Sequence, residues 1–424
     1  MSYLNDWRGL FGSWRQDLVA GISVGIVALP LALGFALTTG APASAGLSTA
    51  IIAGFVAALF GGSNFQVSGP TGAMTVVLVP IVATYGLGAL PALGLAAGVI
   101  IIALSIFRLG RYIDRVPLSV MEGFTLGIAL IIALQQIPLI LEVPRAQGTH
   151  TVLVALDTLR SAFQEETHWL SIILAFSTLA LKRLWPYLKS KMRITSHLPA
   201  SIVAVLTLSL IAYVADLETA RIGEIPRSLS FDFNLTAPDI PITNFLYSAV
   251  VIAMLGAIES LVSARVADGL ARQQIDHEQP KHEPNKELFG QGLATIASVS
   301  AGGLPATGAI ARTSVNVHAG ARTRLSAMTH SLFLLLVVLF MAPVVSQIPT
   351  AVLAGVLLGT SLRIANPRSV KEALQTTGSQ RIVYCVTAVS VLFIDLIWGV
   401  IIGIFVDYLA TKVEQRKKFQ ELLP

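Results

Sequence analysis

Two ionisable residues stand inside long apolar stretches of the sequence, where charges are otherwise rare. Glu259 lies in M-L-G-A-I-E-S-L-V-S-A-R (254–265), and Arg312 lies in G-G-L-P-A-T-G-A-I-A-R-T-S-V-N (302–316). If these stretches cross a bilayer, a charge near its centre costs roughly 2.5–3.5 kcal/mol, so such residues usually face a cavity and have partners. We therefore expect Glu259 and Arg312 to pair, either as a fixed buried ion pair or as parts of a binding site.

Arg312 is easier to explain as an anion ligand than as a stabilising residue. It follows the predicted start of a helix, where a cation is unfavourable to the helix dipole. We hypothesise that ionised Glu259 neutralises Arg312 in the empty protein. An arriving anion would compete for the same positive field, so that Glu259 takes up a proton. Anion and proton would then bind with positive and reciprocal coupling, which predicts H⁺/anion symport.

Two interrupted apolar segments are predicted to position these charges. Gly69-Pro70 halts the first, where Pro70 suits the first turn of a new helix, and Pro305 has the equivalent role in the second. From each break about 15 residues remain before the next polar turn, so each remainder is predicted to be a half-helix starting near the membrane centre. The alternative interpretation is a pair of proline-kinked structural helices.

Two facing helix N-termini offer unpaired N–H groups and partial positive charge, which together favour an anion. Glycine there lets a substrate approach the backbone closely. The residues predicted to line this site are Ser68, Gly69, Thr71, Gly72, Thr307, Gly308, Ala309 and Ile310.

Composition indicates a membrane protein without a large soluble domain. The 424 residues are 54% hydrophobic and 12% charged, with a mean hydropathy of +0.73, whereas soluble domains are about a quarter charged. Apolar runs long enough to cross a hydrocarbon core of about 30 Å recur along the whole chain. The first run, residues 18–37, has no A-x-A cleavage site, so we interpret it as a retained span rather than a signal peptide.

Several kinds of site are excluded. A single cysteine, Cys385, rules out disulfides and cysteine-based metal sites. The cluster D-H-E-Q-P-K-H-E (276–283) places His277 and His282 five apart around a proline, which fits a solvated loop rather than a metal-binding helix. No nucleophile–base or metal constellation appears in any predicted span, so we expect neither an enzyme nor a cofactor.

The distribution of the basic residues along the chain indicates a membrane topology rather than a nucleic-acid-binding surface. We predict fourteen spans, with the third at 68–85 and the tenth at 306–321. If the N-terminus is cytoplasmic, 24 of the 29 basic residues fall on the cytoplasmic side, as the positive-inside rule expects for two cytoplasmic termini. The exceptions are Arg145, Arg160, Arg221 and Arg227 in outer loops and the intramembrane Arg312.

Internal similarity indicates a duplication. V-P-L-S-V-M-E-G-F-T-L-G (116–127) matches I-P-T-A-V-L-A-G-V-L-L-G (348–359), and T-G-A-M (71–74) matches T-G-A-I (307–310) at nearly the same offset. Seven spans per half is an odd number, so the second copy is inverted, as in alternating-access transporters. The expected divisions are a first repeat (1–215), an outer loop (216–241), a second repeat (242–412) and a cytoplasmic tail (413–424).

Three segments resemble the sulfate permease (SulP) family of anion transporters. These are S-G-P-T-G-A-M-T-V, N-K-E-L-F-G-Q-G (285–292) and G-G-L-P-A-T-G-A-I-A-R-T-S-V-N-V-H-A-G-A-R-T (302–323). The resemblance implies an all-α, fourteen-span inverted-repeat fold shared with uracil permease. A core domain (spans 1–4 and 8–11) moves against a gate domain (spans 5–7 and 12–14) in an elevator-like cycle.

The resemblance also implies functional details. It places Ser68, Gly69, Thr71, Thr307, Gly308, Ala309, Ala311 and Arg312 at the anion site, Glu259 as the acid of the eighth span, and Phe35 facing the substrate. Family members are bacterial inner-membrane proteins in this reading, usually homodimers, and commonly continue into a cytoplasmic STAS domain. This chain ends where that domain would begin, which suggests truncation and weakens the expectation of a dimer. Glu259 together with Arg312 resembles proton-coupled members.

Other functions remain open from the sequence. A nucleobase permease would share the fold but would want carboxylates in both the eighth and tenth spans, where this chain has Arg312. An uncoupled anion channel or a chloride/bicarbonate exchanger is the other alternative. The sequence does not name the anion: sulfate, bicarbonate and a C4-dicarboxylate such as fumarate are all candidates.

Overall fold

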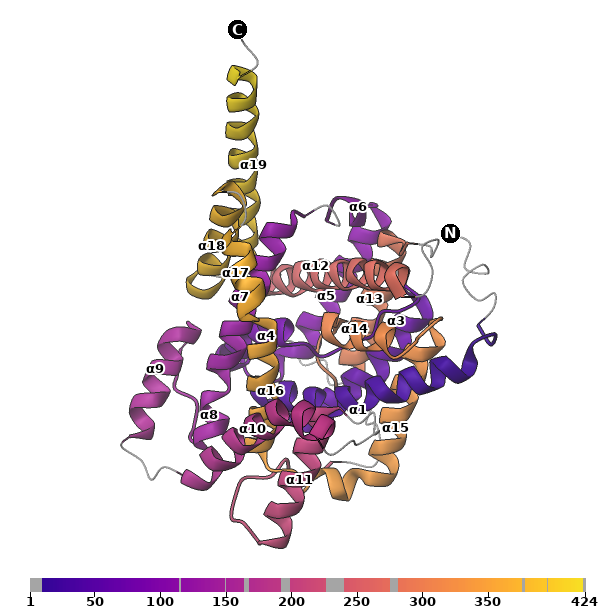
Figure 1. Ribbon diagram of the computed structural model, residues 1–424, viewed down its shortest axis with the longest axis vertical. Helices are drawn as coiled ribbons and strands as arrows, with labels where there is room; N and C mark the ends of the chain where they lie inside the picture. The colour runs from indigo at the N-terminus through magenta and orange to yellow at the C-terminus, as the bar shows by residue number, and fades with distance from the viewer. Residues whose placement is uncertain are drawn as a thin grey trace.

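The computed structural model describes residues 10–113, 116–148, 150–163, 168–191, 199–225, 240–274, 281–375, 378–394 and 396–421. Most of the outer loop predicted at 216–241, the end of the tail predicted at 413–424, and His277 lie outside these residues. Figure 1 shows a helical body from which the last helix projects toward the C-terminus.

The first half of the chain contains eleven α-helices, one π-helical turn (η2) and one short strand in its described part. They are α1 (Trp14–Thr39), α2 (Ala43–Ser48), η2 (Thr49–Ala53), α3 (Gly54–Phe60), β1 (Ser68–Gly69), α4 (Gly72–Tyr85), α5 (Ala89–Ile106), α6 (Gly110–Ile113), α7 (Leu118–Gln135), α8 (Ile137–Leu141), α9 (Thr151–Ala162), α10 (Trp169–Lys191) and α11 (Ala200–Val214).

The second half contains eight helices and the second short strand in its described part. They are α12 (Ile242–Gln274), α13 (Pro284–Ser300), β2 (Thr307–Gly308), α14 (Ile310–His318), α15 (Leu325–Val345), α16 (Thr350–Ile364), α17 (Pro367–Gln375), α18 (Gly378–Phe393) and α19 (Leu396–Glu421).

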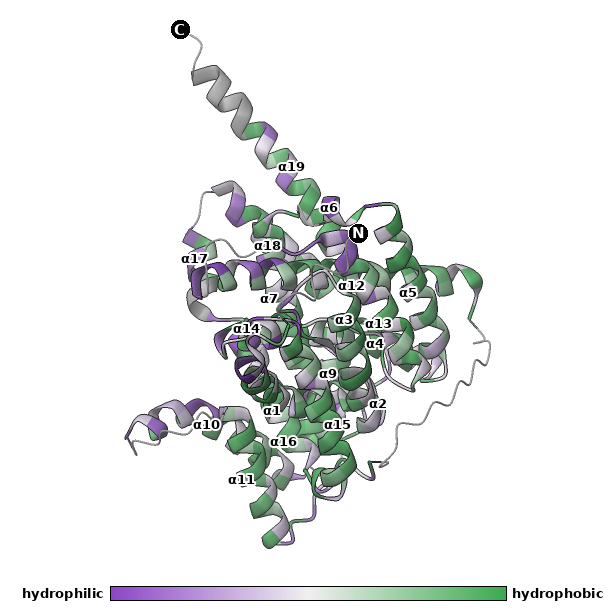
Figure 2. Cartoon of the chain, turned by 90° about the vertical axis from the view of Figure 1, so that its right-hand side faces the viewer, coloured by the Kyte–Doolittle hydropathy of each residue, from purple (hydrophilic) through white to green (hydrophobic). Residues whose placement is uncertain are grey.

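Seven helical stretches among the described residues are long and apolar enough to cross a membrane, and α4, α11, α16 and α18 are shorter apolar helices. Large hydrophobic side chains stand exposed on them, for example Phe340 (76% exposed) and Val214 (75%). Figure 2 shows hydrophobic residues over most of the helices, with hydrophilic residues concentrated at α17 and one end of α10. Such an apolar surface fits a lipid environment. The count of fourteen spans stays a prediction.

Small residues bring the helices close together. A Cβ at Gly21 would lie 2.4 Å from the Ser326 carbonyl of α15, and one at Gly98 would lie 2.9 Å from the Gly292 carbonyl of α13. Side chains of any larger size would push these helix pairs apart.

The glycines matched between the two halves make equivalent contacts. A Cβ at Gly123 of α7 would lie 2.4 Å from the Tyr384 carbonyl of α18, and one at Gly355 of α16 would lie 2.4 Å from the Ala175 carbonyl of α10. Each helix of the matched motif therefore packs its glycine face on one neighbour.

The position of Asp17 near the start of a span suggests a residue at the membrane interface. In the structure, however, its side chain is fully buried. Its Oδ1 accepts hydrogen bonds from the backbone N–H groups of Arg322 (2.7 Å) and Thr323 (3.0 Å), and its Oδ2 accepts from the Thr323 hydroxyl (2.8 Å). A single carboxylate of α1 thus holds the turn between α14 and α15. The partners come from some 300 residues away, so local sequence carries no sign of them.

Asp17→Asn is expected to lower the free energy of unfolding by about 2 kcal/mol, because a buried amide replaces an acceptor of charge-assisted hydrogen bonds. Thermal unfolding in detergent measures this. Asp157→Asn is the control, since Asp157 pairs with Arg160 on the surface of α9 and exposed pairs contribute little. Equal melting temperatures for the two variants would contradict this role of Asp17.

Candidate functional site

The two interrupted segments meet at the centre of the molecule. β1 and β2 pair antiparallel, with Ser68 opposite Gly308 and Gly69 opposite Thr307, and α4 and α14 begin just beyond them near the middle of the body in Figure 1. The π-helical turn η2 lies against this crossing: a Cβ at Gly69 would be 3.3 Å from the Ala50 Cα. The sheet satisfies backbone groups that a broken membrane helix would leave unpaired.

The two segments differ in register although their T-G-A motifs match. Thr71 is the N-cap of α4, and its hydroxyl accepts from the Met74 N–H (3.2 Å). Thr307 instead lies in β2, and α14 starts at Ile310 after Ala309, which provides no side-chain cap. The predictions that Pro70 and Pro305 occupy the first turn of a helix are therefore wrong, because both prolines precede the N-cap of the helix that follows them. The Thr-Gly pair opens the helix in the first half and pairs as a strand in the second.

Helix α12 fastens both segments. The Glu259 Oε2 accepts hydrogen bonds from the Thr71 hydroxyl (2.8 Å) and the Thr307 hydroxyl (2.7 Å), so one carboxylate oxygen joins the two halves. The next residue, Ser260, accepts from the Gly308 N–H (3.0 Å). Glu259 is 9% exposed.

A cavity of ≈ 170 Å³ lies beside this crossing. Its lining comprises Leu31, Phe35, Pro70, Thr71, Gly72, Ala73, Met121, Phe124, Thr125, Ile128, Ile132, Glu259, Ala309, Ile310, Ala311, Arg312, Thr360 and Ile364. Pockets for drug-sized ligands measure about 300–1,000 Å³, so this smaller volume suits a small ion.

Eight of the residues predicted for the site line this cavity, and four do not. Those that line it are Phe35, Thr71, Gly72, Glu259, Ala309, Ile310, Ala311 and Arg312. Ser68, Gly69, Thr307 and Gly308 form the strands beside it. The Ser68 hydroxyl donates to the Gln291 Oε1 (2.9 Å), so this side chain serves the packing of β1 on α13.

Arg312 reaches the cavity with spare hydrogen-bonding capacity. The side chain is 1% exposed, and its Nη2 donates to the Pro70 carbonyl (2.5 Å). Its Nη1 is buried and has no hydrogen-bond partner among the residues that the structure describes. A buried unpaired donor of a charged group is costly, and an anion in the cavity would satisfy it.

The expected contact between Glu259 and Arg312 is absent. No carboxylate oxygen of Glu259 lies within 4.0 Å of an Arg312 nitrogen in the described part of the chain. Glu259 is bound by two threonine hydroxyls and Arg312 by a carbonyl, so each has its own partners. The fixed ion pair considered from the sequence is therefore wrong as a direct contact, although the two charges still interact electrostatically across the site.

Gly69 makes room for Arg312 rather than for a substrate. Its φ of +154° is one that side-chain-bearing residues rarely adopt, and a Cβ there would lie 2.6 Å from the Arg312 Nη1. Likewise a Cβ at Gly308 would lie 2.3 Å from the Gln66 Nε2. Only Gly72 of these glycines lines the cavity, where a Cβ would meet Ile132 and Phe35.

Gly69→Ala is expected to reduce anion uptake about tenfold, because the added methyl group moves the Arg312 guanidinium from its position and a φ of +154° is strained for a residue with a side chain. A tenfold change corresponds to about 1.4 kcal/mol. Uptake into proteoliposomes measures it. Gly88→Ala is the control, since a Cβ there meets no atom within 4 Å. An active Gly69→Ala protein would contradict the proposed position of the guanidinium.

The side of the cavity formed by α7 and α16 was not predicted from the sequence. Met121, Phe124, Ile128 and Ile132 of α7 and Ile364 of α16 line it, and they are as apolar as any lipid-facing residue. Thr125 and Thr360 are its polar members. The matched motifs at 116–127 and 348–359 lie mostly in these two helices. The residue types alone do not distinguish the helix face that lines the cavity from the other faces.

Two further predictions concern polar clusters. His282, expected in a solvated loop, has a side chain only 4% exposed, and its backbone N–H and Nδ1 both bind the Asp268 carboxylate. Within the described ranges, no three His, Cys, Asp or Glu side chains gather as metal ligands would.

The chain is similar to proteins named as sulfate or bicarbonate transporters. The profile of the sulfate permease family matches residues 14–387. A putative sulfate transporter of Bacillus subtilis, YvdB, is 35% identical over 405 residues, which cover 93% of this chain and 73% of the relative. The bicarbonate transporter BicA of Picosynechococcus is 33% identical over 427 residues, covering 97% of this chain and 72% of BicA.

The fold is also similar to those of solved structures. The transmembrane domain of a cyanobacterium bicarbonate transporter BicA has a TM-score of 0.78 at 30% identity, over 95% of this chain and 98% of that domain. SLC26A9 has a TM-score of 0.82 at 17% identity, over 97% of this chain and 67% of SLC26A9, and shows likeness of fold alone.

Proposed function

Because the chain belongs to the sulfate permease family of anion transporters, we propose that it carries a small anion by H⁺-coupled symport in an elevator-type cycle. The anion binds in the ≈ 170 Å³ cavity between the N-termini of α4 and α14. The names of the relatives put sulfate and bicarbonate first among its substrates, and a C4-dicarboxylate such as fumarate is a third candidate.

One observation carries this proposal: the buried Arg312 guanidinium beside a small cavity has one nitrogen without a hydrogen-bond partner among the described residues. Desolvating a cation without an ion pair is expensive, and an ionised ligand compensates it best. The uncapped start of α14 adds backbone donors and partial positive charge in the same place. A neutral base gains little from such a site, which argues against a nucleobase permease.

Glu259 supplies the proton coupling. Its carboxyl group lines the same cavity as Arg312 without pairing with it. An anion brought between them repels an ionised Glu259, so the bound state favours the protonated acid. The two threonine hydroxyls adapt to either state, because a hydroxyl donates to a carboxylate and accepts from a carboxylic acid.

The arrangement of the cavity supports movement of a core against a gate. The polar groups that would hold the anion belong to α4, α12 and α14, whereas α7 and α16 offer mainly apolar side chains. A smooth apolar surface lets the binding site slide without breaking hydrogen bonds. A wider cavity of ≈ 770 Å³, lined by Val19, Ser23, His318 and Arg363 among others, shares Ala311 and Ile364 with the site and provides a path to it.

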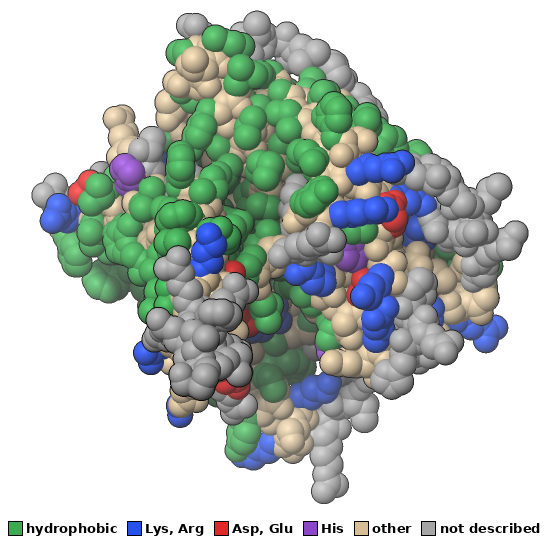
Figure 3. Space-filling view, turned by 90° about the horizontal axis from the view of Figure 1, so that it is seen from above, with side chains coloured by type: hydrophobic (Ala, Val, Ile, Leu, Met, Phe, Trp, Pro, Cys, Tyr) green, Lys and Arg blue, Asp and Glu red, His purple; other side chains and the backbone are tan. Residues whose placement is uncertain are grey.

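We propose that this wider cavity opens to the cytoplasm of a bacterial inner membrane, with both termini on that side. Figure 3 shows Lys and Arg side chains gathered over part of the molecular surface, while hydrophobic side chains cover much of the rest. The predicted positive-inside bias supports this orientation. A homodimer stays a prediction.

Proteoliposome uptake of sulfate, bicarbonate, chloride and fumarate, each with and without an inward proton gradient, tests the proposal. Accumulation of one anion above its external concentration only under the gradient is the expected result. Equilibration of the anion independent of the gradient would instead identify the alternative, an uncoupled channel or exchanger.

A further inference from the structure

Three cavities follow one another along α1. Val19 and Ser23 line the ≈ 770 Å³ cavity, Leu31 and Phe35 line the central site, and residues 37–40 line a third cavity of ≈ 680 Å³. The third cavity also lies one helical turn beyond Ile132 on α7, at Gln135. It shares no lining residue with the central site. It therefore occupies the same core–gate interface on the far side of the site.

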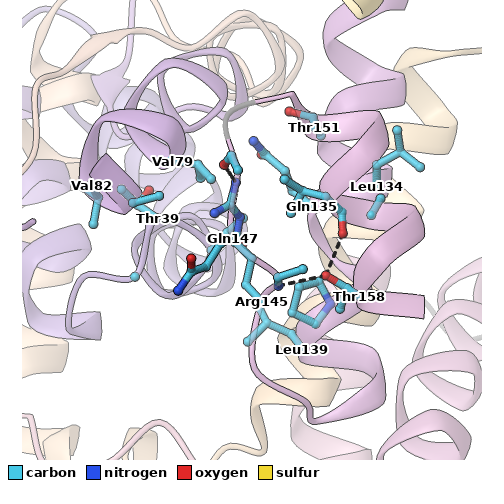
Figure 4. A pocket seen from close by; sticks show the side chains of 18 of the residues that line it. Thr39, Val79, Val82, Leu134, Gln135, Leu139, Arg145, Gln147, Thr151 and Thr158 are labelled. Atoms are coloured by element: carbon cyan, nitrogen blue, oxygen red, sulfur yellow. Dashed lines mark hydrogen bonds between the residues drawn. The ribbon is translucent and has the colours of Figure 1, made fainter. Parts of the chain in front are cut away.

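A positively charged side chain, that of Arg145, lines the third cavity. Arg145 lies in the segment between α8 and α9, and Figure 4 shows Arg145 and Gln147 between Thr39, Val79 and Val82 on one side and Gln135 on the other. The Arg145 Nη2 donates to the Gly148 carbonyl (3.0 Å). Partial burial desolvates this charge and so lowers the pKa of Arg145.

The acids nearest in sequence are engaged elsewhere. Glu142 accepts hydrogen bonds from the Ser171 hydroxyl and the Ala220 N–H, and Asp157 pairs with Arg160. Within the described part of the chain, no carboxylate forms an ion pair with Arg145. Its positive charge is therefore available to the cavity.

A second, independent observation points to a ligand. Gln135 is 8% exposed, and neither its Nε2 nor its Oε1 has a hydrogen-bond partner among the described residues. A buried primary amide with both ends unpaired is unusual in native proteins. Gln135 and Arg145 line one cavity, and their side chains carry N–H donors suited to an anion. The threonines at 38, 39, 84, 151 and 158 add polar lining.

We propose that this cavity is an outer capture site that binds a small oxyanion or carboxylate before it enters the central site. The inference rests on the proposed function, since it assigns the same class of anion to both sites. Arg145 is the charged ligand and Gln135 the neutral one. The cavity is wide enough for a partly hydrated anion, so binding there is weak and serves mainly to raise the local anion concentration.

Chemical modification tests the electrostatics without relying on transport. In a Cys385→Ala background, Thr151→Cys places one thiol on the cavity wall. The measured quantity is the ratio of the reaction rates of a negatively charged and a positively charged methanethiosulfonate. We expect this ratio to be about fivefold higher with Arg145 than in the same protein with Arg145→Gln, the effect of one partly solvated charge. Arg145→Lys should restore the preference, and millimolar sulfate should slow the anionic reagent.

Arg160→Gln is the matched control, because this arginine of α9 has a side chain 80% exposed and does not line the cavity. It should leave the reagent preference unchanged. In uptake assays at anion concentrations far below KM, Arg145→Gln should slow entry about fivefold and Arg160→Gln should not. An unchanged reagent preference in Arg145→Gln would overturn the capture site. Absence of anion uptake by the unmodified protein would overturn the proposed function, while the reagent ratio would still decide whether the cavity attracts anions.

Discussion

Arg312→Gln is expected to weaken anion binding by about tenfold to a hundredfold and to abolish measurable uptake at low anion concentration. The substitution removes the one charged donor that lines the central cavity among the described residues. Hydrogen bonds to charged groups contribute about 1.5–3 kcal/mol each, which corresponds to that range. Uptake of the anion identified by the proteoliposome screen measures the loss.

Arg324→Gln separates this effect from general damage to the fold. Arg324 is also 1% exposed, but its guanidinium donates to the Ala58 and Leu59 carbonyls and to Asn64, away from the cavity. Its loss should reduce stability while leaving the KM of the folded fraction unchanged. Arg312→Lys keeps the charge without the planar pair of donors and should retain part of the affinity. Wild-type KM in Arg312→Gln would contradict the assignment.

Glu259→Gln is expected to abolish accumulation driven by a proton gradient while preserving anion exchange. Gln mimics the protonated acid, so the two threonine hydroxyls at 71 and 307 keep a partner and the anion site stays formed. With one proton per monoanion, each pH unit of gradient supports about tenfold accumulation in the unmodified protein at zero membrane potential. The variant should reach only equal concentrations on the two sides.

Glu122→Gln is the control for Glu259→Gln, because it removes an exposed acid of α7 that does not line the cavity. This variant should accumulate the anion as the unmodified protein does. Unaltered pH dependence in Glu259→Gln would refute proton coupling through this residue.

The meeting of the two broken segments could be predicted from sequence. Gly69-Pro70 and Pro305 interrupt apolar runs in matching halves, and the structure pairs Gly69 with Thr307 across β1 and β2. Helix-breaking residues act locally and the duplication is visible as matching motifs, so both signals are present in the chain itself.

The finer geometry could not be predicted. Charge alone suggested that Glu259 and Arg312 pair, but hydroxyls and a carbonyl from the broken segments lie closer to them and take their hydrogen bonds. Gly69 illustrates the same limit. The sequence predicts that a substrate approaches the backbone closely at Gly69, whereas the structure places the Arg312 guanidinium there.

Equilibrium binding of the labelled anion to the purified protein in detergent tests the central claim most directly. We predict saturable binding that strengthens as the pH is lowered, because proton and anion bind with positive coupling, and no saturable binding to Arg312→Gln over the same concentrations. Equal binding by the unmodified protein and Arg312→Gln would contradict an anion site built around this guanidinium.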